Sequence, residues 1–136
     1  MTALAANRNT PRIERNKRVF PVAAATKIYA GAQVGVNASG NAVPITTATG
    51  LKGAGRAAHL ADNSGGVAGA IDIEVEIGTF RFENSAAADL ITKADIGADA
   101  YGVDDQTVAK TSATNTRSIV GKIHDVDDQG VWVTYS

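Results

Sequence analysis

Apolar and acidic residues alternate along residues 71–77, which read Ile-Asp-Ile-Glu-Val-Glu-Ile. Successive side chains of a strand point to opposite faces, so this segment predicts a β-strand with one buried face and one acidic face. Beyond Gly78 the parity changes, because Phe80 and Phe82 now hold the apolar positions. We expect a β-bulge at Gly78 and Thr79 to restore the phase, so that one core continues along the whole segment.

The acidic face of this strand consists of Asp72, Glu74 and Glu76. The pattern favours the solvated side of a half-buried strand. Two alternatives stay open: a pair of these carboxylates acts in catalysis, or the stripe meets a basic surface on a partner subunit.

Turn residues separate several further apolar segments. Residues 34–36 and 43–45 flank the Asn- and Gly-containing segment 37–41, which is typical of a β-hairpin. We expect a weaker strand over 51–58, because glycine and alanine dominate it, and a flexible loop over 62–66.

The last third of the chain contains a short internal echo. Residues 101–108 and 124–131 both carry an apolar residue before Asp-Asp-Gln, with valine resuming two positions later. Asp side chains bond to their own backbone and favour turns, so both segments are predicted hairpin tips. Residues 118–123 and 131–135 should pair as the strands that flank the second tip.

One segment favours a helix. Residues 85–91, Ser-Ala-Ala-Ala-Asp-Leu-Ile, predict about two helical turns, with Asn84 or Ser85 available as the N-terminal cap. Thr92 is followed three residues later by Asp95, a spacing that predicts one more capped turn.

Composition agrees with a β-rich domain. The chain has 10 Ile, 13 Val and 13 Thr but only four Leu, and branching at Cβ suits a pleated sheet better than a helix. Its 136 residues are the length of one domain. We therefore expect an all-β fold over residues 19–136, either a jelly-roll-like β-sandwich or a small barrel.

The N-terminal segment, residues 1–18, differs from the rest. Residues 1–56 hold eight of the 13 Lys and Arg residues but one of the 14 acids, and the basic excess is densest at the front. The cations there are Arg8, Arg12, Arg15, Lys17 and Arg18. Only Leu4 and Ile13 are large and apolar, which is too little to fold alone, so we expect an extended basic arm.

Three roles are open for this arm. It could bind nucleic acid, although Phe20 is the only aromatic residue nearby. It could be a solvated tail. The favoured hypothesis is that it lies on a neighbouring subunit and adds a strand to that subunit's sheet, with Arg and Lys engaging acids.

Catalytic and metal-binding patterns are scarce. The only histidines are His59 and His124, neither in a recognisable catalytic motif, and there is no cysteine. Residues 53–58 fit Gly-x-Gly-x-x-Ala but lack a preceding hydrophobic strand, so a glycine-rich strand or loop is favoured over a phosphate site. Residues 125–130 begin like a calcium loop, but Ser136 occupies the position of the bidentate Glu, and a solvated turn is favoured. We expect no enzyme activity, cofactor or metal.

Hydropathy gives the expected location. The longest apolar runs, such as residues 22–25, are far shorter than a membrane span, and no apolar run follows the N-terminal bases as in a secretory signal. We expect a soluble protein that is made in the cytoplasm.

Several of these segments together resemble a known family. In chain order they are the basic arm, VNASGNAVPI, GTFRFENS, ADLITKADIGADAYGVDDQTVAKT and IVGKIHDVDDQGVWV. This order is similar to that of the small capsid cement, or decoration, proteins of tailed bacteriophages. The similarity is strongest over residues 80–133, weaker back to residue 19, and confined to type in the arm.

The resemblance implies a β-sandwich or barrel on the outer surface of the virion, after synthesis in the host cytoplasm. It implies the major capsid protein as partner, self-association as a dimer or trimer, and no membrane or direct nucleic-acid contact. The arm cations named above would then pair with acidic capsid residues. Trp132 is expected in the core, or alternatively at an oligomer interface. Two rival functions are a nucleic-acid-binding protein and a carbohydrate-binding phage module.

Overall fold

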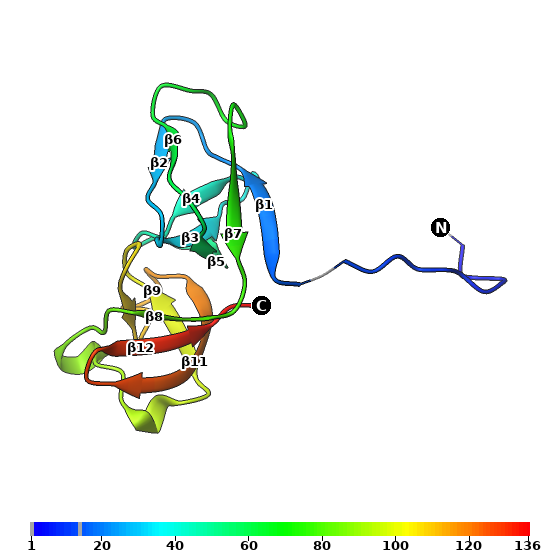
Figure 1. The fold of residues 1–136 in the computed structure, drawn as a ribbon. Coiled ribbons are helices and arrows are strands. Elements are labelled where there is room, and N and C mark those ends of the chain that lie inside the picture. The colour runs from blue at the N-terminus through cyan, green and yellow to red at the C-terminus, as the bar shows by residue number, and fades with distance from the viewer. Residues whose placement is uncertain (1, 14) are drawn as a thin grey trace.

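The computed structural model describes residues 2–13 and 15–136. Their strands form two five-stranded sheets and one two-stranded sheet, as Figure 1 shows. The ladders within these sheets are antiparallel. The prediction of an all-β fold is confirmed.

The first sheet has the strand order β1-β7-β5-β3-β4. Its strands are β1 (Lys17–Pro21), β3 (Gln33–Val36), β4 (Ala42–Pro44), β5 (Lys52–Ala57) and β7 (Asp72–Glu76). A two-stranded sheet accompanies it, made of β2 (Thr26–Ile28) and β6 (Ala61–Asn63). Directly after β1, Val22 forms a parallel bridge with Ala42 of β4. The outer strands of the sheet therefore meet, and the sheet curls into a rounded first lobe (Figure 1).

The second sheet has the order β10-β9-β11-β12-β8. Its strands are β8 (Thr79–Phe82), β9 (Asp99–Gly102), β10 (Val108–Ala109), β11 (Ile119–Asp127) and β12 (Gly130–Thr134). A parallel bridge between Glu83 and Thr107 joins the ends of its two outer strands. This sheet forms the second lobe (Figure 1).

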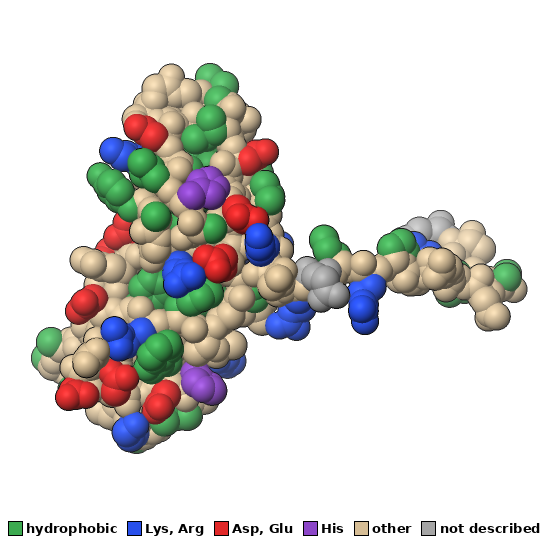
Figure 2. All heavy atoms as spheres, viewed as in Figure 1, with side chains coloured by type: hydrophobic (Ala, Val, Ile, Leu, Met, Phe, Trp, Pro, Cys, Tyr) green, Lys and Arg blue, Asp and Glu red, His purple; other side chains and the backbone are tan. Residues whose placement is uncertain are grey.

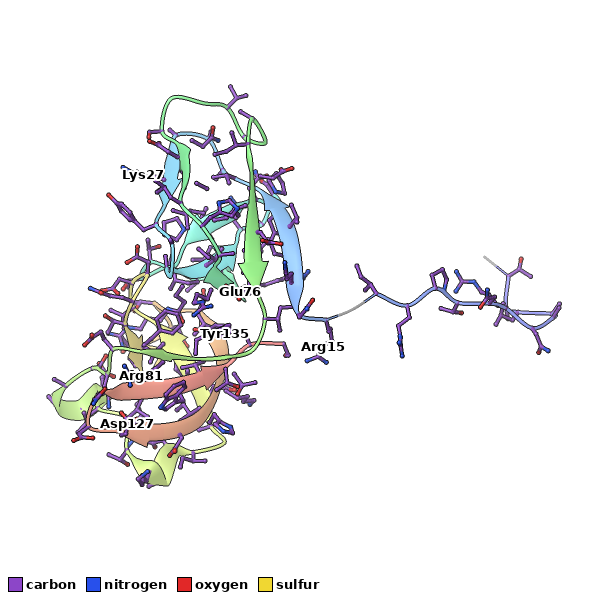
Figure 3. The ribbon with its side chains drawn as sticks, viewed as in Figure 1. Arg15, Lys27, Glu76, Arg81, Asp127 and Tyr135 are labelled. Atoms are coloured by element: carbon purple, nitrogen blue, oxygen red, sulfur yellow. The ribbon has the colours of Figure 1, made fainter. Side chains whose placement is uncertain are left out.

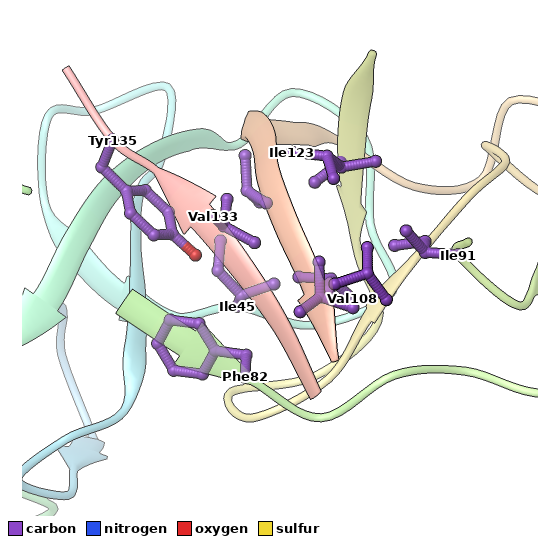
Figure 4. Close-up of a cluster of buried hydrophobic side chains, with 11 residues drawn as sticks. Ile45, Phe82, Ile91, Val108, Ile123, Val133 and Tyr135 are labelled. Atoms are coloured by element: carbon purple, nitrogen blue, oxygen red, sulfur yellow. The ribbon is translucent and has the colours of Figure 1, made fainter. Parts of the chain in front are cut away.

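The predicted bulge at Gly78 and the predicted single core are wrong. Strand β7 belongs to the first sheet and β8 to the second, so the parity change marks a crossing between sheets. Ile73 and Val75 are buried in the first lobe's cluster, whereas Phe82 is buried in the second lobe's cluster, shown in Figure 4. Side chains that change face at Gly78 still become buried, because the chain passes to a different core.

The two lobes are joined by a buried polar contact. Gln33 of β3 is fully buried, and its Nε2 donates a hydrogen bond to the Asp104 carbonyl at 3.0 Å. Its Oε1 accepts a hydrogen bond from the Tyr135 hydroxyl, which comes from the end of the second sheet. The Gln33 main-chain N–H donates to the Asp105 carbonyl at 2.7 Å. One side chain of the first lobe thus bonds to two segments of the second.

Close packing continues this junction. A Cβ atom on Gly53 of β5 would lie 2.0 Å from the Val120 carbonyl oxygen of β11, so only glycine permits this approach. Ile45, which follows β4 in the first lobe, is buried in the second lobe's cluster (Figure 4). The lobes therefore pack against each other through both backbone and side chains.

The predicted hairpins are confirmed. Strand β3 pairs with β4, and the Asn37 side chain accepts hydrogen bonds from two main-chain N–H groups of the turn between them. Strand β9 pairs with β10, and β11 with β12. Each of the two echoed tips contains the same kind of hydrogen bond. Gln106 N–H donates to Asp104 Oδ1 at 2.9 Å, and Gln129 N–H donates to Asp127 Oδ1 at 2.8 Å.

The predicted helix over residues 85–91 is wrong. Only a single 3₁₀ turn forms, at Ala87–Asp89, and Ala87 has a φ of 55°. Neither expected cap acts as one. Asn84 exchanges two hydrogen bonds with the Ile91 main chain, and Ser85 donates to the Val108 carbonyl at 2.9 Å. These side chains hold the segment against the second sheet rather than start a helix.

The capped turn after this segment is confirmed. It is a 3₁₀ turn at Lys93–Asp95, and Thr92 N–H donates to Asp95 Oδ2 at 2.8 Å. The flexible loop predicted over residues 62–66 is partly strand β6 instead. Asn63 is only 3% exposed, and its Nδ2 donates to the carbonyls of Ala23 and Val67, each at 2.9 Å.

Candidate interaction surface

Residues 2–13 and 15–16 form a projecting arm that runs away from both lobes (Figure 1). Every residue of it that the structure describes is exposed, including Leu4 at 74% and Ile13 at 86%. It ends at Asn16, whose carbonyl accepts a hydrogen bond from the Ile77 N–H at 3.0 Å. An extended segment with so much exposed surface is suited to contact another molecule.

The five predicted capsid-binding residues divide into two groups. Arg8, Arg12 and Arg15 lie on the projecting arm. Lys17 and Arg18 instead belong to β1, so the predicted arm of residues 1–18 is two residues too long. The structure therefore places three of the cations on an exposed extension of the sheet and two on the sheet itself.

The two cations of β1 already have partners within the chain. Lys17 Nζ lies 3.2 Å from Glu74 Oε1, and the Arg18 guanidinium lies 4.7 Å from the centre of the Phe20 ring. Arg8 donates to the Thr10 hydroxyl at 3.2 Å, a contact local to the arm. Since exposed ion pairs of this kind contribute little to stability, Lys17 remains available to exchange one carboxylate for another.

Strand β1 forms an outer edge of the first sheet. It pairs with β7 on one side, and in the described part of the chain its other side has no strand partner until the bridge from Val22, just after β1, to Ala42. Val19, in the middle of β1, is 63% exposed. The outer edge and the projecting arm form one continuous surface, along which an extended segment of a partner could add as a strand.

The acidic stripe is the solvated face of β7, as predicted. Ile73 and Val75 are fully buried, while Asp72 is exposed and Glu74 and Glu76 are half-buried. Glu76 Oε1 accepts a hydrogen bond from the Arg56 guanidinium at 2.9 Å. Two carboxylates of the stripe are thus paired within the chain, Glu76 with Arg56 and Glu74 with Lys17.

A groove runs along the outer edge of β8, where the two lobes face each other. Thr79 and Phe80 lie at one end of it, Arg81 and Phe82 in the middle, and Glu83 at the other end. Residues from both faces of β8 line the groove, as expected of a groove that follows the edge of a strand. Its remaining walls, from both lobes, are Gly31, Arg56, Gln106, Gln129 and Trp132. We call this feature the β8 groove.

Cations stack on aromatic rings in the β8 groove. The Arg56 guanidinium lies 4.5 Å from the centre of the Phe80 ring, and the Arg81 guanidinium lies 5.6 Å from the Trp132 ring. Trp132 Nε1 donates to Asp127 Oδ2 at 3.0 Å, and this hydrogen bond lowers the pKa of that carboxyl below its ordinary value. Trp132 is therefore half-buried beside the groove, and its expected place in the core is wrong. Tyr135 is the buried aromatic residue of this strand end.

Two hairpin tips that carry carboxylates border one end of the β8 groove. Gln106 and Gln129, which line it, each follow an Asp-Asp pair at a hairpin tip. Figure 2 shows acidic side chains on the side of the second lobe that faces away from the projecting arm. Figure 3 places Arg15 and Asp127 on opposite sides of the molecule. The sequence signal for this cluster was the repeated Asp-Asp-Gln, which indicated turns but not their proximity.

Neither histidine belongs to a catalytic arrangement among the described residues. His59 Nε2 accepts a hydrogen bond from the Glu74 N–H at 3.2 Å, and His124 is exposed on β11. The Gly-x-Gly-x-x-Ala segment forms β5, as the favoured interpretation predicted. Residues 125–130 form the hairpin between β11 and β12, and no group of three or more metal-ligating side chains occurs in the described ranges.

No family model matches the chain, and neither a curated protein nor a solved structure was found to be similar to it. Over residues 2–13 and 15–136, no helix is long and apolar enough to cross a membrane.

Proposed function

We propose that this protein is a capsid cement protein of a tailed bacteriophage, which binds the outer surface of the head and stabilises contacts between major capsid subunits. The observation that carries the proposal is the projecting arm, an exposed basic extension of an edge strand on a well-packed body. Arg8, Arg12 and Arg15 give it three cations, and Lys17 and Arg18 continue the basic surface onto β1.

The proposed mechanism combines main-chain pairing with electrostatics. An extended capsid segment would add to the outer edge of β1, where main-chain groups provide affinity. Cations of the arm and of β1 would pair with capsid carboxylates and set the orientation of the subunit more than its raw affinity. Many copies bind a repetitive lattice together, so weak single contacts suffice.

The body supplies rigidity in this proposal. Two lobes that share the buried Gln33 contact and the close approach at Gly53 resist bending relative to each other. A rigid body that is fixed by an arm at one side can hold two capsid subunits at a set distance. No step requires a cofactor or a reaction.

The test is co-sedimentation of the purified chain with undecorated phage heads over a series of salt concentrations. The proposal predicts saturable binding at a fixed ratio to capsid subunits, weakened by salt because exposed charges are screened. Duplex DNA and a glycan resin serve as parallel ligands. Absence of binding to heads at low salt, with retention on DNA or on the resin, would contradict the proposal and favour the corresponding rival function.

A further inference from the structure

The β8 groove has the properties of a docking site for an extended segment. Strand β8 pairs with β12 on one side, and no described strand pairs with its other side over Thr79–Phe82. The next residue, Glu83, already has main-chain partners there: its N–H donates to the Gln106 carbonyl at 2.7 Å, and its carbonyl accepts from the Val108 N–H at 3.0 Å. The unpaired edge is therefore that of Thr79–Phe82. A segment that lies there would extend the second sheet by one strand. This edge differs from that of β1, which belongs to the first sheet.

Charge indicates what kind of segment fits. Glu83 lies at the acidic end of the groove, between the hairpin tips that carry Asp104, Asp105 and Asp128. The ion pairs formed among the described residues use other carboxylates than these four. The surroundings of this end therefore favour an extended segment with cationic side chains.

The cations of the groove itself do not reverse this preference. Arg56 is paired with Glu76, and Arg81 lies over Trp132 beside the carboxylate of Asp127. Both guanidinium groups thus have a nearby carboxylate. The unpaired charge around the groove is negative.

We propose that the projecting arm of a second copy of this chain occupies the β8 groove, with Arg8 and Arg12 at its acidic end. The arm is the extended basic segment that this chain possesses. Fully extended, residues 8–16 span about 30 Å, so Arg8 can reach the surface of a second copy that adjoins the arm side of the body. The proposal rests on the cement function and changes one part of it: Arg8 and Arg12 meet a neighbouring copy, whereas Arg15, Lys17 and Arg18 meet the capsid.

The donor copy is distinct from the acceptor copy for a geometric reason. The arm leaves the body on the side opposite to the hairpin tips, as the positions of Arg15 and Asp127 in Figure 3 show. Reaching its own groove would require the arm to fold back around the body. Passing to a neighbour requires only that it continue in the direction in which it already runs (Figure 1).

Single-cysteine cross-linking tests the proposal, because the natural chain has no cysteine. An Arg8→Cys chain and a Gln129→Cys chain, which carry tags of different mass, are mixed without capsids and mildly oxidised. We expect a disulfide-linked heterodimer in at least ten-fold higher yield than for Arg8→Cys mixed with Ser39→Cys, a control position at an exposed turn of the first lobe. Equal yields from the two mixtures would overturn the proposal.

A doubly substituted chain tests the alternative that the arm folds back. Arg8→Cys and Gln129→Cys in one chain should give intermolecular products at high protein concentration and little internal disulfide on dilution. A concentration-independent internal disulfide would overturn the choice of a second copy. Repeating the oxidation on heads adds one more decisive outcome: a product between Gln129→Cys and the major capsid protein, without any arm product, would assign the groove to the capsid.

Charge exchange separates electrostatics from chance contact. For this experiment the donor cysteine is placed at Asn9→Cys instead of position 8. Arg8→Glu with Arg12→Glu in that donor should lower the heterodimer yield about ten-fold, and Glu83→Lys with Asp128→Lys in the Gln129→Cys acceptor should restore it. Restoration requires that these particular charges meet. These reactions contain no capsid, so a low heterodimer yield would contradict the arm exchange and not the cement function. Absence of binding to heads in co-sedimentation would contradict the cement function and not the arm exchange.

Discussion

Replacement of Tyr135 by phenylalanine removes one oxygen atom from the contact between the two lobes. The Tyr135 hydroxyl donates to Gln33 Oε1, and both side chains are at most 1% exposed. Phenylalanine keeps the ring and its edge-on contact with Phe82, whose centre lies 6.1 Å away. The substitution therefore leaves the packing unchanged and the Gln33 acceptor without that partner.

An unsatisfied buried acceptor costs about 1–3 kcal/mol of stability. In a domain of this length each kcal/mol lowers the melting temperature by about 3 °C, so we expect Tyr135→Phe to lower it by about 3–10 °C. Burial raises the pKa of the Tyr135 hydroxyl above its ordinary value, so it stays protonated at pH 9. The difference in melting temperature between Tyr135→Phe and the natural chain should thus be the same at pH 6 and at pH 9.

Calorimetric melting of the variant beside a matched control measures this effect. Tyr29→Phe makes the same chemical change on a ring that is 58% exposed, and should shift the melting temperature by less than about 1 °C. In a Gln33→Met background the tyrosine substitution should cost clearly less than in the natural chain, because the two groups are coupled. A Tyr135→Phe variant that melts with the Tyr29→Phe control would refute the link between the lobes.

Three further predictions concern the body. Gly53→Val, which places a side chain against the Val120 carbonyl, should cost more than about 3 kcal/mol or abolish folding, whereas Gly65→Ala, where a Cβ meets nothing within 4 Å, should change the urea midpoint little. Asn63→Ala removes the side-chain donor to the buried Ala23 carbonyl, while the Val67 carbonyl keeps the Ala70 N–H at 3.1 Å, and should cost about 1–3 kcal/mol by urea unfolding; a loss within error would show that solvent replaces the amide. The pKa of Asp127 is lowered in the native state, so the unfolded chain takes up more protons in acid. The urea midpoint should hold from pH 7 to about pH 5 and fall toward pH 3, and Asp127→Asn should reduce that fall.

Local patterns in the sequence predicted the elements whose cause is local. The repeated Asp-Asp-Gln placed two hairpin tips correctly, because the Asp carboxylate bonds to a main-chain N–H two residues on. The same holds for the Asn37 hairpin and for the Thr92 turn, where one polar side chain fixes the geometry. The alternation over residues 71–77 identified β7 and its buried face, because neighbouring side chains of a strand point to opposite faces.

The errors have a non-local cause. The crossing from β7 to β8 depends on two separate cores, and a change of parity alone is equally compatible with a bulge. Asn63 appeared to be a loop residue because its partners are carbonyls far away in the sequence. Asn84 and Ser85 were the predicted helix caps, but both side chains instead hydrogen-bond to carbonyl groups elsewhere in the second lobe. Without a cap, the helix does not form.

The interaction surface was predicted in part. The high density of cations before residue 19 indicated the arm. That density does not show which cations belong to the sheet, where Lys17 pairs with Glu74. The β8 groove had no sequence signal of its own, because its walls come from six separate segments that only the fold brings together. Its aromatic and cationic residues are ordinary strand positions when read one by one.

In the proposed function, the projecting arm attaches a rigid body to the capsid. The most direct measurement compares the occupancy of undecorated heads by the full chain and by a chain that lacks residues 2–16, at equal concentration, over a series of salt concentrations. We expect the truncated body to melt within a few degrees of the full chain and to occupy far fewer sites, with the remaining binding more sensitive to salt. Unchanged occupancy by a correctly folded truncated body would contradict the proposed function.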